Sequence, residues 1–370
     1  MDDRAKKPEL SIIVPALNEA GTIGDLIRNL AAQKDVNFEV ILSDGGSTDG
    51  TPDMFRKEAQ NASFPARSIH MGRGRGRQMN GGAEVASGDF LLFLHADSLF
   101  EDPNALRKAL DALGEAMQAV GHERVAGRFT LRFRRQDGTP SLFYYYHECK
   151  AGLDRGECIH GDQGFLLHRS FFSSVGPFEE TIPILEDTRF AETVRGRGTW
   201  ILCPSVIFTS ARRFETEGCA ERETLNAMVM TLSAIGRADF LDEMPRVYAV
   251  QNRAGRLRLY PFFYRIRELL KALPLRERMR FWYQCGCHAA ANSWQIAFFL
   301  DVWRNFSKGI PPGEGQFQLL RCFDRFLVKV PENRLIRISA ASLVWLWFYT
   351  MLVCRYVREN TRRVGTRHFC

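Results

Sequence analysis

Three short apolar runs, each followed by polar side chains, are the feature that most constrains how this chain can fold. Residues 10–14, 38–42 and 90–94 are mostly β-branched or otherwise apolar, and segments of helical character lie between them. Strands that alternate with helices are typical of a parallel sheet with crossover helices. We therefore expect an α/β domain at the start of the chain.

Polar residues stand where each of these runs ends. The first run leads into Pro15-Ala-Leu-Asn-Glu19, the second into Asp44, and the third, FLLFLHADS, into His95 and Asp97. In open α/β sheets the ligand crevice lies outside the carboxyl ends of the strands. The three ends together predict a ligand site, although Asp44 or Asp97 alone could simply cap a turn, and His95 alone is more typical of a core residue.

Helices are expected after the first two runs. Apolar residues recur at helical spacing between residues 23 and 30, which predicts a helix behind the first loop. The second loop reads SDGGSTDGT, where glycines permit a tight turn. Asp49 or Ser47 is expected to cap a helix that starts near Thr51.

Length and charge divide the chain in two. Residues 219–370 hold 24 Lys and Arg against 12 Asp and Glu, whereas residues 1–218 hold 26 against 31. We expect a catalytic domain over residues 1–218, a helical tail or linker over 219–250, and a basic, mainly helical domain over 251–370. The basic part should seek an anionic partner. Nine cysteines without framework spacing and an N-terminus without an apolar segment favour a reducing, cytoplasmic setting.

The basic part also carries apolar segments. Residues 260–282 interleave aromatic and basic side chains, and residues 283–304 are expected to form one largely apolar helix. Such an amphipathic basic surface fits an anionic membrane or an acidic partner. Residues 338–354 are uncharged, but their length is at the short limit of a membrane span, roughly 17–25 residues. We favour a buried or interfacial helix there.

Four motifs, in order, resemble those of a known family. They are SIIVPALNEAGTI, SDGGSTDGT, FLLFLHADS and LEDTRF, and together they resemble the family-2 glycosyltransferases, which have the GT-A fold. MGRGRGRQMNGGA, GDQGFLL and TSARRFE resemble the subgroup of radical-SAM/selenodomain-associated transferases. The resemblance covers about residues 9–218. It implies a Rossmann-like, mixed but mostly parallel sheet flanked by helices, and the transfer of a sugar from a nucleotide donor.

On the donor side, the resemblance assigns positions to the nucleotide sugar. The loop from Pro15 to Glu19 would border the nucleotide, and Asp44 would bind the base or ribose, although Gly45 stands where the family usually has a second acid. Gln78-Met79-Asn80 replaces the common Ala-Arg-Asn, so the role of that arginine could have moved to a neighbouring one. The donor-binding set is Pro15, Ala16, Asn18, Glu19, Asp44, Arg73, Arg75, Arg77, Asn80, His95, Ala96, Arg212 and Arg213.

The same resemblance implies the catalytic residues. The usual D-x-D reads His95-Ala96-Asp97, where Asp97 matches the metal-contacting aspartate and His95 and Ala96 stand beside the sugar or ribose. Glu186 and Asp187 match the E-D motif, whose aspartate is the general base. The cation is expected to be Mg²⁺ or Mn²⁺, because a hard cation stabilises the departing diphosphate.

Two features keep alternatives open. Gly161, Asp162 and Gln163 could contact donor or acceptor or form a structural turn, and Arg212 and Arg213 could neutralise the diphosphate or lie on a solvated face.

The expected reaction is a metal-dependent, inverting glycosyl transfer to an unknown acceptor, with a UDP-sugar as the favoured donor and no nucleic acid as partner. A GT-A-like nucleotidyltransferase is the enzymatic alternative. The second alternative is a non-catalytic scaffold that docks a membrane or a protein through residues 251–370. The expected location is cytoplasmic, with peripheral attachment to the inner face of the membrane as an option.

Overall fold

Two compact units make up the computed structural model of the chain, which describes residues 7–182, 184–249, 251 and 255–365. Unit 1 contains residues up to Thr139 and His147–Ala211, and unit 2 contains Pro140–Tyr146 and the residues from Arg212 onward. Helix α5 (Leu142–Ala151) carries residues of both units. The division after Ala211 groups the next helix with unit 2, whereas the boundary expected from sequence lies after residue 218.

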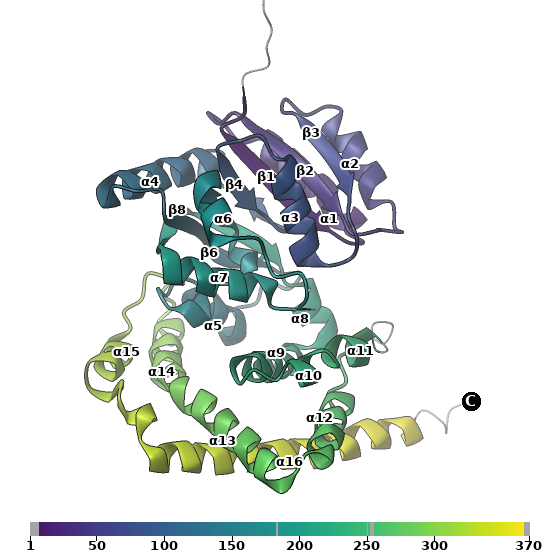
Figure 1. Ribbon diagram of the computed structural model, residues 1–370, viewed down its shortest axis with the longest axis vertical. Helices are drawn as coiled ribbons and strands as arrows, with labels where there is room; N and C mark the ends of the chain where they lie inside the picture. The colour runs from purple at the N-terminus through teal and green to yellow at the C-terminus, as the bar shows by residue number, and fades with distance from the viewer. Residues whose placement is uncertain (1–6, 183, 250, 252–254, 366–370) are drawn as a thin grey trace, which may run out of the picture. The chain divides into compact units, whose positions relative to one another are not determined.

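Unit 1 is an eight-stranded mixed sheet with helices on both faces (Figure 1). The strand order is β3-β2-β1-β4-β7-β6-β8-β5. Its strands are β1 (Leu10–Ala16), β2 (Phe38–Asp44), β3 (Ala66–His70), β4 (Phe90–Phe93), β5 (Leu99–Phe100), β6 (Val125–Arg134), β7 (Phe165–His168) and β8 (Thr199–Ser210). Its helices are α1 (Ala20–Ala31), α2 (Thr51–Ala59), α3 (Arg75–Val85), α4 (Ala105–Val120), α6 (Arg169–Val175) and α7 (Glu186–Arg197), with short 3₁₀ turns η1 (Gly156–Cys158) and η2 (Gly161–Gln163).

The three apolar runs form neighbouring strands. β1 pairs in parallel with β2 and with β4, and β2 pairs in parallel with β3. β6 and β8 are also parallel, whereas β4 with β7, β6 with β7 and β5 with β8 are antiparallel. The expectation of a mixed, mostly parallel sheet is confirmed. The predicted helices after the first two strands are α1 and α2, and α2 begins at Thr51 as expected.

Two apolar layers cover the sheet. Leu10, Ile12 and Val14 of β1 belong to the layer shared with α1, α2 and α4, whereas Ile13 belongs to the layer shared with α3, α6 and α7. Successive side chains of a strand point to opposite faces, so a strand covered on both sides must be apolar throughout. This burial is the reason why the runs lack polar residues until they end.

Helix α3 lies very close to β1. A Cβ atom added at Gly82 would lie 2.3 Å from Cγ2 of Ile13, which is a branched and buried side chain. Glycine is therefore required where this helix crosses the strand. The close approach holds the first turn of α3, which carries Arg75 and Gln78, over the ends of the central strands.

Unit 2 is helical, as expected for the C-terminal region. Its helices are α8 (Arg212–Glu217), α9 (Cys219–Ala234), α10 (Ala238–Leu241), α11 (Met244–Ala249), α12 (Tyr260–Ala272), α13 (Leu275–Ala291), α14 (Trp294–Ser307), α15 (Gln318–Cys322) and α16 (Arg334–Gly365), with a π-helical turn η3 (Phe323–Leu327) and a 3₁₀ turn η4 (Val330–Glu332). The expectation of one helix over residues 283–304 is wrong, because α13 ends at Ala291. The side chain of Asn292 donates to the carbonyl of His288 and ends the helix there.

Helix α16 packs into unit 2 along one side. Phe348 and Leu352 are 4% and 6% exposed, and Phe348 contacts the rings of Phe263 and Trp282. Helix α13 approaches α16 so closely that a Cβ atom at Gly286 would lie 2.4 Å from the backbone nitrogen of Ala341.

Residues 334–359 of α16 are also long and apolar enough to cross a membrane, although that test by length and composition is weak evidence.

We predict that Gly82→Ala destabilises the protein by about 1–3 kcal/mol, because the new methyl group forces Ile13 or the backbone of α3 to move. Chemical denaturation, followed by the fluorescence of the native protein, measures the change. Gly114→Ala in α4 is the matched control, since its Cβ meets nothing within 4 Å and it should stabilise by about 0.5–1 kcal/mol. Equal midpoints for the two variants would contradict the prediction.

Candidate active site

Two loops at the carboxyl ends of β1 and β2 are tied to each other. The backbone N–H of Asn18 donates to the hydroxyl of Ser47 at 2.9 Å, and the N–H of Thr48 donates to the side-chain oxygen of Asn18 at 2.9 Å. Asn18 itself has a φ of 58°, a left-handed conformation that asparagine tolerates better than most residues. The predicted loop from Pro15 to Glu19 is thus held in one shape.

Asp44 is engaged in its own turn. The buried carboxylate accepts the backbone N–H groups of Gly46 at 3.0 Å and Ser47 at 3.1 Å, and one oxygen lies 3.6 Å from Nδ1 of His70. These contacts fit the local-turn interpretation of this aspartate. The binding of a base or ribose by Asp44 stays a prediction.

The unusual pair Gly45 and Gln78 fits together. The amide of Gln78 donates to the carbonyls of Ala16 at 2.7 Å and Ser43 at 2.8 Å, and so joins the ends of β1 and β2. A Cβ atom at Gly45 would lie 3.0 Å from that amide. A larger residue at position 45 and Gln78 would therefore compete for the same space, so glycine at position 45 leaves room for the Gln78 amide.

Of the predicted arginines, Arg75 is the one directed at the catalytic motif. Its guanidinium lies 3.3 Å from the buried carboxyl of Glu186. Arg77 instead pairs with Glu180 at 3.2 Å, and Arg73 is exposed. Asn80 is buried, and its amide donates to the carbonyl of Phe178 at 2.9 Å and to Glu180 at 2.8 Å, so this side chain holds a loop of the domain.

The end of β4 delivers the predicted metal ligand. β4 ends at Phe93, and His95, Ala96 and Asp97 follow in a turn closed by the N–H of Ser98 and the carbonyl of His95 at 3.1 Å. His95 and Asp97 are half-buried, and Ala96 is buried. Arg134 of β6 donates to the backbone carbonyl of Asp97 at 3.2 Å, so β6 steadies this turn.

Asp187 is oriented by the turn η2. The N–H of Gly161 donates to one carboxylate oxygen of Asp187 at 2.7 Å, and the N–H of Thr188 donates to the other at 2.7 Å. A Cβ atom at Gly161 would lie 2.9 Å from that first oxygen, so glycine is needed for the contact. Leu185, just before the motif, has a φ of 72°, which costs a leucine roughly 1–2 kcal/mol.

The carboxyl groups lie near enough to shift one another. Burial, together with the charges of Asp187 and Asp97, raises the pKa of Asp162 to about 7. Burial raises the pKa of Glu186 as well. Burial also acts to raise the pKa of Asp187, but Arg75, His160 and the Gly161 N–H outweigh it and leave that pKa below its usual value. Asp187 is therefore ionised at neutral pH.

His160 is a site residue that the sequence reasoning missed. Its charge, when present, lowers the pKa of Asp187, and it stands immediately before Gly161. The signal available in the sequence was this adjacency to the GDQG motif. A histidine beside an unknown turn could not be paired with a carboxylate that lies so far along the chain.

Gln163 and the pair Arg212 and Arg213 are the remaining predicted site residues. Gln163 is buried and makes a structural turn, with its amide donating to the carbonyl of Ala151 at 2.7 Å and accepting the N–H of His160 at 3.0 Å. Arg212 and Arg213 belong to unit 2, so their role toward the diphosphate stays a prediction.

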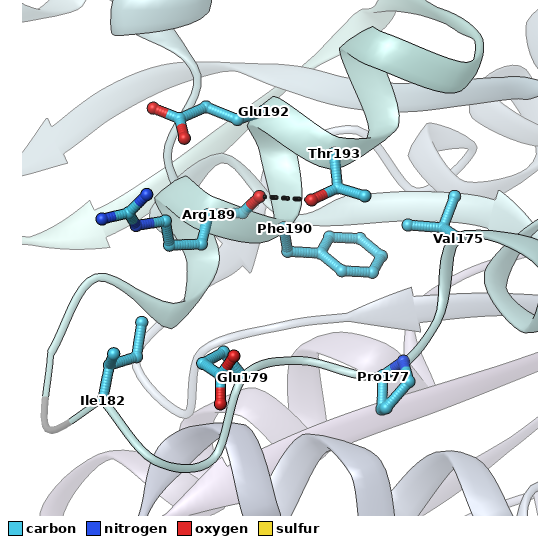
Figure 2. Close-up of a pocket in the computed structure, with 8 residues that line it drawn as sticks. All are labelled: Val175, Pro177, Glu179, Ile182, Arg189, Phe190, Glu192 and Thr193. Carbon is cyan, nitrogen blue, oxygen red and sulfur yellow. Dashed lines mark hydrogen bonds between the residues drawn. The ribbon is translucent and has the colours of Figure 1, made fainter. Parts of the chain in front are cut away.

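A pocket of about 440 Å³ lies beside α7 (Figure 2). Figure 2 shows the ring of Phe190 between the helix and the loop that carries Pro177, Glu179 and Ile182. Arg189 and Glu192 add opposite charges to its wall. This pocket is one helical turn from Asp187 along α7, but its lining is different from the carboxyl cluster.

Asp162 makes stability depend on pH. A carboxyl with a pKa of about 7 in the folded state and an ordinary one in the unfolded state keeps its proton longer when folded. The unfolding free energy should therefore fall as the pH rises from about 4 to about 7 and then level off. We predict this course for the difference between the native protein and Asp162→Asn, measured by chemical denaturation in EDTA.

Asp137→Asn is the contrasting control for that experiment. Hydrogen bonds from the N–H and the hydroxyl of Thr139 lower the pKa of Asp137. The contribution of this carboxylate to the unfolding free energy is therefore lost only as the pH falls below about 4. A pH-independent difference for Asp162→Asn would overturn the placement of Asp162 among like charges.

Comparison with known proteins finds similarity over the first part of the chain. A model of the glycosyl transferase family 2 matches residues 11–176, a range that ends before Glu186 and Asp187. A PGL/p-HBAD biosynthesis glycosyltransferase of Mycobacterium tuberculosis is 29% identical over 185 residues, which are 50% of this chain and 68% of that protein. An undecaprenyl-phosphate 4-deoxy-4-formamido-L-arabinose transferase of Pseudomonas syringae is 29% identical over 133 residues, 35% of this chain and 37% of that protein.

Solved structures resemble the chain more weakly. The mannosyltransferase PcManGT from Pyrobaculum calidifontis, in complex with GDP-Man and Mn²⁺, has a TM-score of 0.45 and 15% identity, with 96% of this chain and 87% of that chain covered. TarS of S. aureus in complex with UDP-GlcNAc has a TM-score of 0.42 and 16% identity, with 82% and 92% covered. The likeness to glycosyltransferases therefore comes from the sequence matches. The match to the glycosyl transferase family 2 model covers residues 11–176, and the curated relatives that resemble this part of the chain are glycosyltransferases. The protein is a glycosyltransferase whose first unit is a mixed sheet flanked by helices.

Proposed function

We propose that the protein is a divalent-cation-dependent, inverting glycosyltransferase that moves a sugar from a nucleoside diphosphate to an acceptor hydroxyl. One observation carries the proposal. Asp97 from the end of β4, Asp162 from η2 and Asp187 from α7 lie close enough that, in addition to burial, the charges of Asp187 and Asp97 raise the pKa of Asp162 to about 7. A cluster of carboxyls at the carboxyl end of a parallel strand is what donor binding and proton removal together need.

The donor set fits a hard cation that is shared with the donor. Asp97 would hold Mg²⁺ or Mn²⁺, and carboxylate oxygens are the ligands that these ions prefer. Within the described ranges, no three His, Cys, Asp or Glu side chains are placed to hold a metal ion by themselves. Phosphate oxygens and water would therefore complete the coordination. The bound ion would neutralise the negative charge that develops on the departing diphosphate.

Asp187 would act as the general base. It is ionised at neutral pH, and two backbone N–H groups fix the direction of its carboxylate. It would take the proton of the acceptor hydroxyl as that oxygen attacks the anomeric carbon. Attack from the side opposite to the leaving group inverts the configuration of the sugar. Each hydrogen bond to the carboxylate also limits its rotation, which keeps the accepting oxygen in place.

Arg75 would connect the two halves of the site. It stands at the start of α3, beside the strand ends, and pairs with Glu186 of the catalytic motif. Its positive charge lowers the pKa of both Asp162 and Asp187. Of the three candidate arginines, it is the one that we propose in place of the missing arginine of the common Ala-Arg-Asn pattern.

Sequence patterns support the finer parts of the proposal. A UDP-sugar stays the favoured donor, and the motifs around Gln78, Asp162 and Arg212 support membership of the radical-SAM/selenodomain-associated subgroup. The nine cysteines support a reducing, cytoplasmic location. We also propose that residues 1–218 suffice for the catalytic domain and that residues 251–370 serve another purpose.

Asp187→Asn should leave donor binding intact and lower the rate of transfer by roughly 10²–10⁴-fold, because the amide cannot accept the proton. Release of nucleoside diphosphate from a panel of nucleotide sugars, with simple alcohols and glycosides as acceptors, measures the rate. Asp25→Asn, in an exposed ion pair of α1, is the control. An unchanged rate refutes the base, and pyrophosphate release from a nucleoside triphosphate would instead support the nucleotidyltransferase alternative.

Asp97→Asn should abolish the cation-dependent part of donor binding. Thermal stabilisation by a nucleotide sugar, compared with Mn²⁺ and with EDTA, should show a cation-dependent increment in the native protein and in Asp187→Asn but none in Asp97→Asn. If the increment persists without the Asp97 carboxylate, the cation is held elsewhere.

A further inference from the structure

The turn between α15 and α16 exposes several apolar side chains in succession. Phe326 is 69% exposed, and Leu327, Val328 and Val330 are exposed as well. A phenylalanine exposed to this degree beside three aliphatic residues is unfavourable in water. Something apolar is therefore expected to cover this turn.

The outer side of α16 continues that apolar surface. Its residues at 335, 343, 346, 353 and 357 point away from the buried Phe348 and Leu352, because each residue advances the helix by about 100°. Leu335, Leu343 and Leu346 are 73%, 66% and 56% exposed, and the two valines are exposed too. We call Phe326, Leu327, Val328, Val330, Leu335, Leu343, Leu346, Val353 and Val357 the α16 surface.

The two parts of the α16 surface are connected within unit 2. The short turn η4 contacts both α13 and α16, and η3 leads into it directly. Figure 1 shows the chain running from α15 into the long yellow helix α16 without an intervening domain. The exposed turn therefore lies at the first end of the exposed helix face.

Basic side chains accompany the apolar ones. Arg321, Arg325, Lys329 and Arg334 are exposed in and beside the turn, with Asp324 and Glu332 as the acidic residues of that stretch. Residues 219–370 as a whole hold twice as many basic as acidic residues. Apolar side chains bordered by arginine and lysine complement a bilayer with anionic headgroups.

The contacts of α16 with other helices of unit 2 argue against a membrane-spanning role for this helix. Arg355 pairs with the buried Glu221 of α9 at 3.0 Å, and Glu359 accepts the backbone N–H groups of Leu259 and Tyr260, which start α12, at 3.0 and 3.1 Å. The helix also packs against α13 at Gly286. Crossing a bilayer would break these contacts and remove Arg355 from the buried Glu221, which would keep only its second and longer ion pair, with Arg256 at 3.4 Å.

A second copy of this chain is a poorer occupant. A symmetric dimer would place the same patch on both sides of the interface. Arg325 and Lys329 of one copy would then approach the basic residues of the other. Anionic lipid removes that repulsion and also covers the apolar residues.

We propose that the α16 surface docks the protein on an anionic lipid bilayer, with α16 lying in the interface rather than crossing it. The proposal goes beyond glycosyl transfer and does not depend on the assigned donor, cation or base. Its consequence is that the enzyme would act at the surface of a bilayer, with α16 lying along that surface.

The test is co-sedimentation of the full chain with phosphatidylcholine vesicles, with and without phosphatidylglycerol. The native protein should bind the mixed vesicles, and Leu343→Glu/Leu346→Glu should bind at least about tenfold more weakly, because two apolar side chains would carry charge into the interface. Arg325→Ala/Lys329→Ala should lose roughly fivefold per residue, and only with phosphatidylglycerol present. Val120→Glu, an exposed valine at the end of α4 in unit 1, is the matched control.

Three outcomes would overturn the proposal. If the native protein and Leu343→Glu/Leu346→Glu bind vesicles equally, and circular dichroism shows that the variant is folded, the membrane contact lies elsewhere on the protein. A native dimer that this variant dissociates, without vesicle binding, makes the surface an interface between copies. Native protein that resists extraction by alkaline carbonate shows a span. Because vesicle binding needs no donor, loss of glycosyl transfer alone leaves the proposal standing.

Discussion

The parallel pairing of β1 with β2 and β4 is the constraint on which the rest of unit 1 depends. In this register Ala16 lies beside Asp44, and Ile13 lies beside Phe93, so the loops after all three strands emerge at one edge of the sheet. The amide of Gln78 then joins the first two ends, and the close contact of Gly82 with Ile13 holds α3 above them. Without this register, Asp97 would be a turn residue with no other functional groups near it.

The carboxyl cluster is arranged at a cost to stability. Asp97, Asp162 and Asp187 repel one another, and Leu185 adopts a left-handed conformation just before the motif. Arg75 and the N–H groups of Gly161 and Thr188 offset part of this cost. Backbone strain and like charges of this kind cluster at functional sites, which supports the proposed active site. A divalent cation held by Asp97, as proposed, would relieve part of this repulsion.

Unit 2 differs from unit 1 in the side chains that its helices leave exposed. Its helices bury one side and leave an apolar, basic side exposed, which is uncommon for a protein that is surrounded by water. The contacts of α16 with Glu221, with the start of α12 and with Gly286 hold that exposed side in place. A fixed amphipathic surface suits a bilayer better than a flexible tail does, because little order has to be gained on docking.

The sequence by itself determined the type and order of the elements in unit 1. Short apolar runs with polar ends, alternating with segments of helical character, predict strands covered on both sides. The motifs around Asp97 and Asp187 indicated the type of reaction. It did not determine which residues meet: His160 beside Asp187, Gln78 over Gly45, and Arg75 rather than Arg73 or Arg77 at Glu186. It also missed the break at Asn292, since a capping hydrogen bond can outweigh apolar composition. The spacing of apolar residues in a sequence indicates which side chains are buried locally. Contacts between residues that are distant in the sequence depend on how helices and strands pack, so only the tertiary structure decided these contacts.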